Sequence, residues 1–349
     1  MYQASVVIPT HNRPHYLREA LHSVVTQEGV DLDVIVIGDG AGEDAATVAR
    51  EFPGVRYVWQ PQAGPNAARN HAITLARHDC IALLDDDDIW LPGKMRIQLE
   101  LMTRYPDAAY VFSDFHILRA GRALMSKGLR TWGIPARAWD GILLDPIGPV
   151  SETPSNGAPA DDYPGYWVNL YGALLEHPYV LPTTAVFRKS FLTPDIRFVD
   201  HDFICGDWEF FARLSRRHSA IYMPVETACN RSHEEPGRLT RTPGATQLQC
   251  RLDMISRVWA ADAQFMEDIE HRNTVSRVRF NYLLTLARYQ LRDGEGVAAR
   301  ASLNQAGQLG WQVPMALRLA QLCTSVPGGV ECLRAAYRLM SRARRLLRR

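Results

Sequence analysis

The sequence predicts an α/β protein in which a mixed, mainly parallel sheet is flanked by helices and followed by a C-terminal helical extension. Over the first 115 residues, short apolar runs rich in β-branched residues alternate with segments of helical periodicity. That alternation is typical of parallel strands joined by covering helices. Acidic residues directly follow two of the apolar runs, at the sheet edge where α/β proteins bind ligands. From Gln247 onward helical periodicity dominates.

The elements are expected in a regular order. Strands are predicted at residues 5–8, 33–37, 55–59, 80–84 and 109–112. Helices are predicted between them at residues 14–24, 43–52 and 66–77, and from about Pro92. Pro14 stands where the first helix would begin, because proline suits the first helical turn.

The middle of the chain breaks this rhythm. Residues 121–179 are rich in Pro, Gly, Trp and Tyr and show little periodicity, so an irregular excursion near the site is expected. A strand at 183–187, a helix at 207–217 and a helical hairpin across 293–296 are predicted after it. The predicted organisation is a domain at 1–245, made of a first half at 1–115, an irregular insertion at 116–180 and a second half at 181–245, followed by a helical region at 246–349.

Composition excludes several classes of protein. The 349 residues include 39 Lys and Arg against 38 Asp and Glu, and this balance gives no general attraction to nucleic acid, so no nucleic-acid partner is expected. The six cysteines are dispersed without a CxxC pair, which favours reduced thiols in the cytosol. No signal-peptide pattern and no run of about 18 apolar residues is present, so a cytoplasmic protein is expected.

Four consecutive aspartates, residues 85–88, follow the predicted strand at 80–84. Carboxylates this close repel one another unless a divalent cation or hydrogen-bond donors compensate them. Oxygen ligands suit Mg²⁺ or Mn²⁺, which commonly bridge one or two carboxylates to substrate phosphates. A solvated acidic turn is the alternative, but the position at the end of a buried strand favours a ligand site.

A further acid, Asp39, ends the second predicted strand between Gly38 and Gly40. The flanking glycines allow a ligand to approach the backbone closely. Taken alone, Asp39 is most simply a turn former. Because it shares the carboxyl edge with the aspartate run, it becomes a candidate nucleotide contact.

These segments resemble the family 2 glycosyltransferases of the GT-A fold, over roughly residues 4–115 and 180–241. The resemblance includes an opening strand and loop at residues 6–13, a second-strand motif at 34–40 and a segment before the metal strand at 64–70. It also includes a metal motif at 84–92, an acceptor-side motif at 205–214 and a closing basic loop at 231–240. Gly38 departs from the pattern, which usually has an acid at that position.

The resemblance implies roles for individual residues. It assigns nucleotide-sugar binding to Pro9, Thr10, His11, Asp39, Arg69, Asp85 and Asp86, with the last two as alternatives for the ribose contact. It assigns the metal to Asp87, with His233 completing the metal or diphosphate site. It assigns the diphosphate and acceptor side to Arg231, Arg238 and Trp208.

Asp207 is the predicted general base. A sugar hydroxyl is a poor nucleophile until a positioned base takes its proton, and Asp207 stands at the start of a predicted helix in the acceptor-side motif. Helix N-caps also favour aspartate, so a capping role is the alternative. Glu209, two residues on, is the fallback base.

The resemblance implies transfer of a sugar from a nucleotide-diphosphate sugar, commonly UDP-linked, to a hydroxyl of a glycan or lipid-linked glycan, as in polysaccharide biosynthesis. Direct displacement with inversion is expected, with Mn²⁺ or Mg²⁺ stabilising the leaving group. The alternatives are a noncatalytic nucleotide-sugar binding or scaffold protein, and metal-dependent phosphoryl transfer or hydrolysis. No GxxxxGK[ST] loop supports phosphoryl transfer.

The last residues, 333–349, hold seven arginines and no acid, interleaved with leucines. This pattern predicts a basic amphipathic helix attracted to anionic lipids, and hence peripheral association with the inner face of a membrane. A solvated or frayed tail that packs on the helical hairpin is the alternative.

Overall fold

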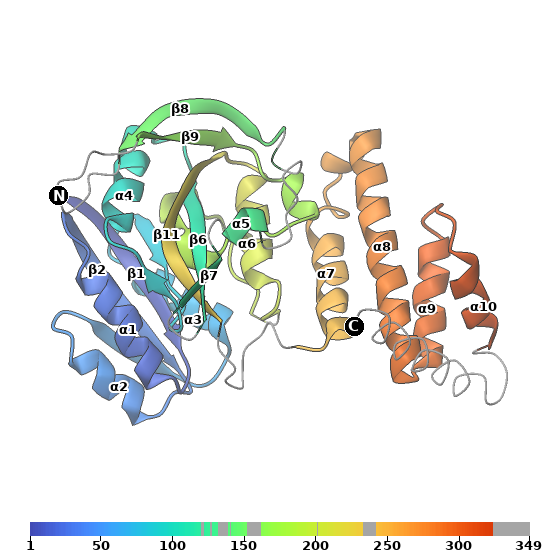
Figure 1. The fold of residues 1–349 in the computed structure, drawn as a ribbon, viewed down its shortest axis with the longest axis horizontal. Coiled ribbons are helices and arrows are strands. Elements are labelled where there is room, and N and C mark those ends of the chain that lie inside the picture. Colours follow the sequence, from blue (N-terminus) through green and yellow to red (C-terminus); the bar gives the residue numbers. More distant parts are fainter. Residues whose placement is uncertain are drawn as a thin grey trace. The chain divides into compact units, whose positions relative to one another are not determined.

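The computed structural model describes residues 1–119, 122–125, 128–131, 139, 141–151, 162–200, 202–232 and 242–323. The chain divides into two compact units, Met1–Pro236 and Gly237–Arg349. Figure 1 shows the first unit as a sheet with covering helices and the second as a set of helices.

The first unit contains the sheet. Its strands are β1 (Tyr2–Thr10), β2 (Val30–Asp39), β3 (Arg56–Gln60), β4 (Cys80–Leu83), β5 (Ile89–Trp90), β6 (Tyr110–Arg119), β7 (Arg122–Met125), β8 (Leu143–Ser151), β9 (Asp162–Val168), β10 (Val186–Arg188) and β11 (Ala220–Ser232). Its helices are α1 (Pro14–Val25), α2 (Glu43–Arg50), α3 (Pro65–Leu75), α4 (Lys94–Arg104), α5 (Gly128–Thr131) and α6 (Gly206–Ser215), with short 3₁₀ turns that include η2 (Ala173–Leu175) and η3 (Pro182–Thr184).

The strands run in the order β3-β2-β1-β4-β10-β6-β11-β9-β8, with β5 paired to β11 and β7 paired to β6. β1 is parallel to β2 and β4, β2 is parallel to β3, and β6 is parallel to β11. β10 lies antiparallel between β4 and β6, so these two share one direction. The predicted fold class, a mixed sheet with a parallel core and flanking helices, is confirmed.

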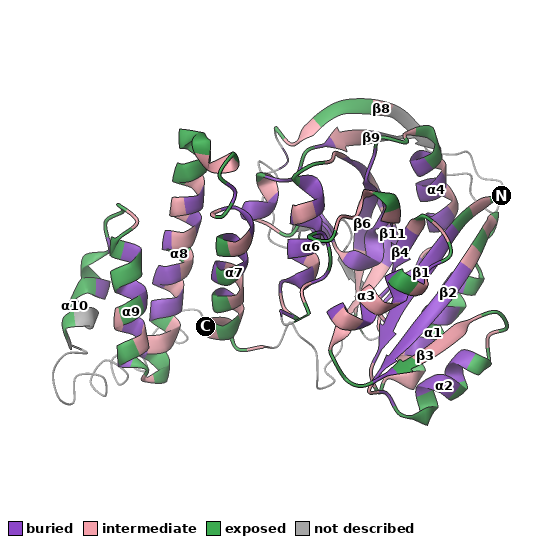
Figure 2. Ribbon diagram, turned by 180° about the vertical axis from the view of Figure 1, so that it is seen from behind, coloured by how far each residue is buried: buried purple, intermediate pink, exposed green. Residues whose placement is uncertain are grey.

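The helical and strand periodicities explain this core. Every residue of β1 from Ala4 onward is buried, as expected of a central parallel strand covered on both faces. α1 begins at Pro14 and buries the predicted stripe of Leu17, Ala20, Leu21 and Val24. Figure 2 shows the buried residues concentrated along β1, β2 and the inner faces of their helices.

Within 116–180, the described residues include strands where irregular structure was predicted. β6 continues to Arg119, and β7, β8 and β9 follow. β8 pairs with β9 at one end of the sheet order, and it holds Pro146 and Pro149, which an edge strand tolerates because no partner needs their missing N–H groups. The prolines of β8 therefore concealed a strand at the end of the sheet order.

β11 was also absent from the predicted elements. Its pairing with β6 shifts register twice between Met223 and Ala228, and these irregularities interrupt the alternation by which a strand is recognised. The strand nevertheless lies inside the sheet and carries Asn230 and Arg231 to the end of β6.

The second unit consists of α7 (Gly244–Val258), α8 (Ile269–Asp293), α9 (Gly296–Gly307) and α10 (Met315–Cys323), among the described residues. Gly294 caps the C-terminus of α8, and its φ of 90° suits glycine. α9 begins two residues later, as the predicted hairpin requires. Leu283, Ala287, Ala299 and Leu303 belong to its apolar core. Within the described part of the chain, no helix combines the length and apolar character needed to cross a membrane. Residues 333–349 lie outside the described part.

Candidate functional site

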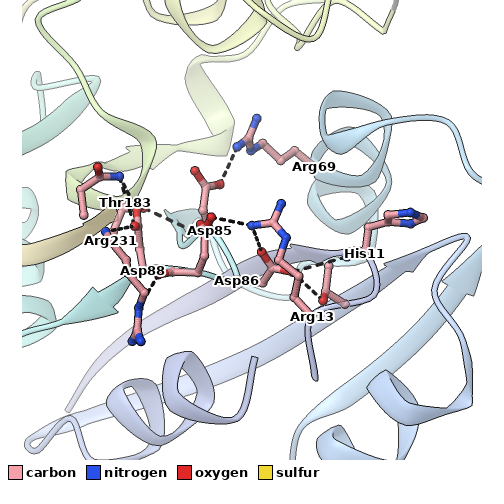
Figure 3. Close-up of polar contacts among 11 residues, drawn as sticks. His11, Arg13, Arg69, Asp85, Asp86, Asp88, Thr183 and Arg231 are labelled. Atoms are coloured by element: carbon pink, nitrogen blue, oxygen red, sulfur yellow. Dashed lines mark hydrogen bonds and ion pairs between the residues drawn. The ribbon is translucent and has the colours of Figure 1, made fainter. Parts of the chain in front are cut away.

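The carboxyl ends of β1, β2 and β4 meet at one edge of the sheet. Thr10 at the end of β1 pairs in register with Gly38 of β2, and Val7 pairs with Leu83 at the end of β4. The loops after these strands therefore lie together and bring the aspartate turn, residues 85–88, close to residues 10–13 and 39. Figure 3 shows the side chains that converge there.

Asp86 points into the protein from the aspartate turn. Its side chain is buried, and its Oδ2 accepts a 2.8 Å hydrogen bond from Thr10 Oγ1. Arg13 Nη1 lies 3.3 Å from its other oxygen, Oδ1. Burial raises the pKa of Asp86 to about 7 against the opposing effect of Arg13. Asp86 is thus held by the end of β1.

Asp85 points the other way, toward α3 (Figure 3). Arg69 Nη2 donates a 2.6 Å hydrogen bond to Asp85 Oδ1, and Arg69 Nη1 donates to Asn66 Oδ1 at 3.0 Å. The Arg69 side chain is 8% exposed and that of Asp85 is 29% exposed. Burial opposes the charge of Arg69, but the negative charges of Asp85 and Asp207 leave its pKa raised. A buried guanidinium therefore lies between two carboxylates of different elements.

The counter-ion of Asp87 is Arg13, which immediately precedes α1. Arg13 Nη1 donates to Asp87 Oδ2, and Arg231 Nε donates to the Asp87 carbonyl oxygen at 3.1 Å. The Asp87 side chain is 15% exposed. Asp87 thus keeps a partly accessible carboxylate at the front of the turn.

Asp88 ties the turn to two other elements. Thr183 Oγ1 of η3 donates to Asp88 Oδ2 at 2.6 Å, while Asn230 Nδ2 and the Arg231 N–H of β11 donate to Oδ1 at 3.1 and 2.9 Å. Burial, and next the charges of Asp87 and Asp85, raise the pKa of Asp88. Its donors and its burial indicate that Asp88 fixes the geometry of the turn.

Asp39 lies at the neighbouring strand end with both carboxylate oxygens engaged. Gln60 Nε2 and the Ala63 N–H donate to Oδ1, and the Gly64 N–H donates to Oδ2, each at 2.8 Å. His11 Nδ1 donates to the Asp39 carbonyl oxygen at 2.6 Å. Asp39 therefore shapes the loop before α3 as well as lining the edge.

The residues expected to contact the nucleotide are thus together. Pro9 is buried in the last part of β1, and Thr10 and His11 follow it beside Asp86 and Asp39. Arg69 and Asp85 complete the same edge. The predicted grouping is present, and the role of each residue stays a proposal.

Asp207 lies in the first turn of α6, and Cys205 holds the N-cap position. The Asp207 carboxylate is half-buried and accepts the N–H of Trp208 at 2.8 Å. Asp202, rather than Asp207, accepts the N–H of Cys205, at 3.0 Å. Burial raises the pKa of Asp207, while Arg69 opposes that change. Asp207 thus accepts an N–H group of the first turn of α6, although Cys205 holds the N-cap position.

Close packing of α3 against the start of α6 holds Arg69 near Asp207. Asn66 Nδ2 donates to the Asp202 carbonyl oxygen at 2.8 Å, and a Cβ on Gly206 would lie 1.9 Å from that nitrogen. Gly206 thus permits an approach that a larger residue would block.

Two predicted residues of α6 are directed elsewhere. Glu209 is fully buried, and its Oε1 accepts hydrogen bonds from Arg213 Nη2 and Nε at 2.7 and 3.0 Å. Trp208 is buried and donates its indole N–H to the Leu174 carbonyl oxygen. Glu209 thus forms its ion pair within α6, and Trp208 links α6 to η2.

Arg231 turns its guanidinium toward α1. It forms an ion pair with Glu19 and stacks over Tyr16, whose ring centroid is 4.8 Å away. In Figure 3 its guanidinium points away from Arg69 and Asp85. His233 and Arg238 lie outside the described residues.

Among the described residues, no three His, Cys, Asp or Glu side chains form a ready metal site. Asp85 and Asp87 are the more exposed acids of the turn. Mg²⁺ and Mn²⁺ often take only one or two carboxylates from a protein and complete their shell with phosphate and water. The residues fit such an ion when a diphosphate supplies further oxygens.

Arg13 and Arg69 compensate the negative charge of the aspartate turn. The importance of Arg13 was not predicted. A signal was available, because Arg13 follows the first strand and parallel strands end at a common edge. Thr183 was predicted only as the first residue of a strand, and Asn230 lies on the unpredicted β11. Their contacts with Asp88 depend on tertiary structure and leave no local pattern.

Known sequences resemble the first part of the chain. Residues 5–134 match the model of glycosyl transferase family 2. The succinoglycan biosynthesis protein ExoW of Rhizobium meliloti is 36% identical over 118 residues, covering 32% of this chain and 37% of that protein. An uncharacterized glycosyltransferase of Rickettsia felis is 35% identical over 103 residues, covering 29% of this chain and 17% of that protein. The chain thus spans well under half the length of these curated relatives.

Solved structures share the fold. TarS residues 1–349 of S. aureus, in complex with UDP-GlcNAc, superposes with a TM-score of 0.53 at 12% identity, over 86% of this chain and 88% of that one. The mannosyltransferase PcManGT of Pyrobaculum calidifontis, in complex with GDP-Man and Mn²⁺, superposes with a TM-score of 0.50 at 11% identity, over 95% of this chain and 86% of that one.

The fold is therefore that of the GT-A glycosyltransferases, as the resemblance implied. The residues that match the model of glycosyl transferase family 2 include β1 and the aspartate turn.

Proposed function

We propose that the chain is a glycosyltransferase that moves a sugar from a nucleotide-diphosphate sugar, UDP-linked, to a hydroxyl of a glycan or lipid-linked glycan. The observation that carries the proposal is Arg69, a buried guanidinium bonded to Asp85 and electrostatically coupled to Asp207. It joins the donor edge to the candidate base. The family match and the nucleotide sugars bound by TarS and PcManGT support the donor class.

The donor's nucleoside binds along the ends of β1 and β2, at Pro9, Thr10, His11 and Asp39. Asp85 takes the ribose contact in preference to Asp86, because Asp85 is the more exposed and Asp86 is already held by Thr10 and Arg13. A carboxylate suits ribose hydroxyls because each of its two oxygens can accept a hydrogen bond from a hydroxyl group.

Asp87 holds a divalent cation, Mn²⁺ or Mg²⁺, together with the diphosphate. When bound, such an ion neutralises the negative charge that develops on the leaving nucleoside diphosphate. Arg69 adds a fixed positive charge at the same edge. His233 remains a proposed additional ligand, and Arg231 and Arg238 remain proposed for the diphosphate side.

Asp207 takes the proton of the acceptor hydroxyl as that oxygen attacks the anomeric carbon. Its raised pKa brings the carboxylate closer to the range in which a general base is effective near neutral pH. Glu209 is the weaker candidate because it holds Arg213. Direct displacement inverts the anomeric configuration.

The noncatalytic alternative predicts that Asp207 only caps α6 and takes no part in sugar transfer. Transfer to labelled acceptors tests the two alternatives. A panel of nucleotide sugars is incubated with Mn²⁺ and with glycan or lipid-linked acceptors, for the native chain and Asp207→Asn. The proposal expects one donor to yield a glycosylated product only with the native chain. Release of free sugar or inorganic phosphate without any glycosylated product would instead favour hydrolysis.

Peripheral association through residues 333–349 with anionic membranes, at the inner face, is part of the proposal for a lipid-linked acceptor. Seven arginines interleaved with leucines support it. A chain lacking 333–349 should float with anionic liposomes less than the full chain does. Equal flotation of the two chains would contradict this part.

A further inference from the structure

Arg13 immediately precedes α1, and its guanidinium lies against two carboxylates of the aspartate turn. Nη1 forms an ion pair with Asp87 Oδ2 and lies 3.3 Å from Asp86 Oδ1. The side chain of Arg13 is 22% exposed, and that of Asp87 is 15% exposed. An ion pair so withdrawn from water is screened less than one on the open surface.

A divalent cation at Asp87 would compete with Arg13 for the same carboxylate. Mg²⁺ binds carboxylate oxygen at about 2.1 Å, so the ion and the guanidinium would hold two positive charges close together on Asp87, where they repel each other. An arginine cannot relieve this repulsion by losing its proton, because it stays charged at any physiological pH. Binding of the cation at Asp87 Oδ2 therefore disfavours the contact of Asp87 with Arg13.

Asp86 offers a nearby position for the displaced guanidinium. Its carboxylate is fixed by Thr10 Oγ1 and already lies within ion-pair distance of Arg13. A small rotation of the arginine side chain would thus exchange Asp87 for Asp86 without leaving the turn uncompensated. Asp85 has a separate counter-ion in Arg69.

We propose that Arg13 is an internal counter-ion that keeps divalent cations off Asp87 until a nucleotide diphosphate is bound. The diphosphate adds negative charge and oxygen ligands, so the cation then outcompetes the guanidinium. This inference rests on the proposed function, because it requires a metal-bound nucleotide at Asp87. It assigns an order in which the metal binds with or after the nucleotide.

Binding of Mn²⁺ alone tests the proposal without any measurement of activity. Free Mn²⁺ is measured by electron paramagnetic resonance in titrations of the native chain, Arg13→Gln, Arg13→Lys and Arg18→Gln. Arg18→Gln is the matched control, because Arg18 lies on α1 and its ion pair with Glu51 is on the surface, with side chains 49% and 42% exposed.

Without nucleotide, Arg13→Gln should bind Mn²⁺ at least about tenfold more tightly than the native chain and Arg18→Gln. With saturating UDP the difference should shrink, because the native arginine has then left Asp87. Arg13→Lys, which keeps the charge but lacks the planar fork, should fall between them. Circular dichroism checks folding, and Arg13→Lys carries the comparison if Arg13→Gln does not fold.

Equal or weaker Mn²⁺ binding by Arg13→Gln without nucleotide would overturn the proposal. Tight Mn²⁺ binding by the native chain in the absence of nucleotide would overturn it too. If the native chain binds Mn²⁺ neither alone nor with UDP while Arg13→Gln binds it alone, the counter-ion role stands and the metal dependence in the proposed function fails. If neither chain binds Mn²⁺ under any condition, both fail.

Discussion

Arg69 of α3 donates a 2.6 Å hydrogen bond to Asp85 of the aspartate turn from a side chain that is only 8% exposed. The same guanidinium lies close enough to Asp207 of α6 for the two charges to influence each other's pKa. One buried positive charge thus connects the element proposed to bind the donor with the element proposed to activate the acceptor.

Replacement of Arg69 by glutamine should lower kcat/KM by about 100-fold, as loss of a preorganised charge in a site typically does. The donor Kd should rise as well, because Asp85 loses the group that orients it. Steady-state kinetics and calorimetry check these two effects. Arg50→Gln removes an exposed α2 arginine paired with Glu43 and should change neither quantity. Equal behaviour of the two variants would refute the role of Arg69.

Thr183→Val should destabilise the first unit by about 1–3 kcal/mol, because the buried carboxylate of Asp88 loses its 2.6 Å donor. The donor Kd should also rise, since Asp88 holds the turn that carries Asp87. Urea unfolding and nucleotide titration provide the measurements. Thr103→Val, at an exposed position of α4 where the hydroxyl contacts the Leu99 carbonyl, is the control. A stability loss no larger than that control would mean that Asp88 does not depend on Thr183.

Lys94 is almost fully buried, beside Gln98 and over the ring of Trp90 at 4.6 Å. Burial lowers its pKa well below the usual range. Between the folded and unfolded pKa values the unfolded chain binds more protons, so stability should rise with pH up to about 10.4. Lys94→Met should therefore stabilise the protein at pH 6 by about 1–3 kcal/mol.

That gain from Lys94→Met should diminish as the pH approaches 10. Urea unfolding at pH 6 and pH 9.5 measures it, with nucleotide affinity as a check that the site is intact. A variant that is less stable than the native chain at pH 6 would show that the ammonium of Lys94 stabilises the fold through Gln98 and Trp90.

Asp207→Asn should lower kcat by about 10²–10⁴-fold, the usual range for removing a general base. Donor affinity should change little, because the replacement has the same size. Burial raises the pKa of Asp207. Native activity should therefore fall as the pH drops through this raised pKa, because the carboxylate becomes protonated. A variant with native kcat would exclude Asp207 as the base.

The sequence predicted the parts of this molecule that repeat a local pattern. The buried run at residues 5–8 and the stripe beginning at Leu17 were sufficient for β1 and α1. Because parallel strands end at a common edge, the sequence also predicted that Asp39 and the aspartate turn lie close together. These features depend on neighbours in sequence or on a general property of α/β sheets.

The parts that sequence reasoning missed depend on distant contacts. The register shifts of β11 and the prolines of β8 disrupt strand patterns, although pairing with β6 and β9 stabilises both strands. Glu209 follows Asp207 by two residues, but the helix directs it to Arg213. The ion pair between Arg13 and Asp87 spans two strand ends and leaves no trace in local spacing.

Nucleotide binding tests the central claim most directly. Calorimetric titration of a panel of nucleotides and nucleotide sugars, with Mn²⁺, with Mg²⁺ and with chelator, compares the native chain with Asp87→Ala. We expect tight, metal-dependent binding of a uridine diphosphate compound that Asp87→Ala loses while its thermal unfolding stays close to native. If no nucleotide binds under any metal condition, the proposed function is refuted and only the shared fold remains.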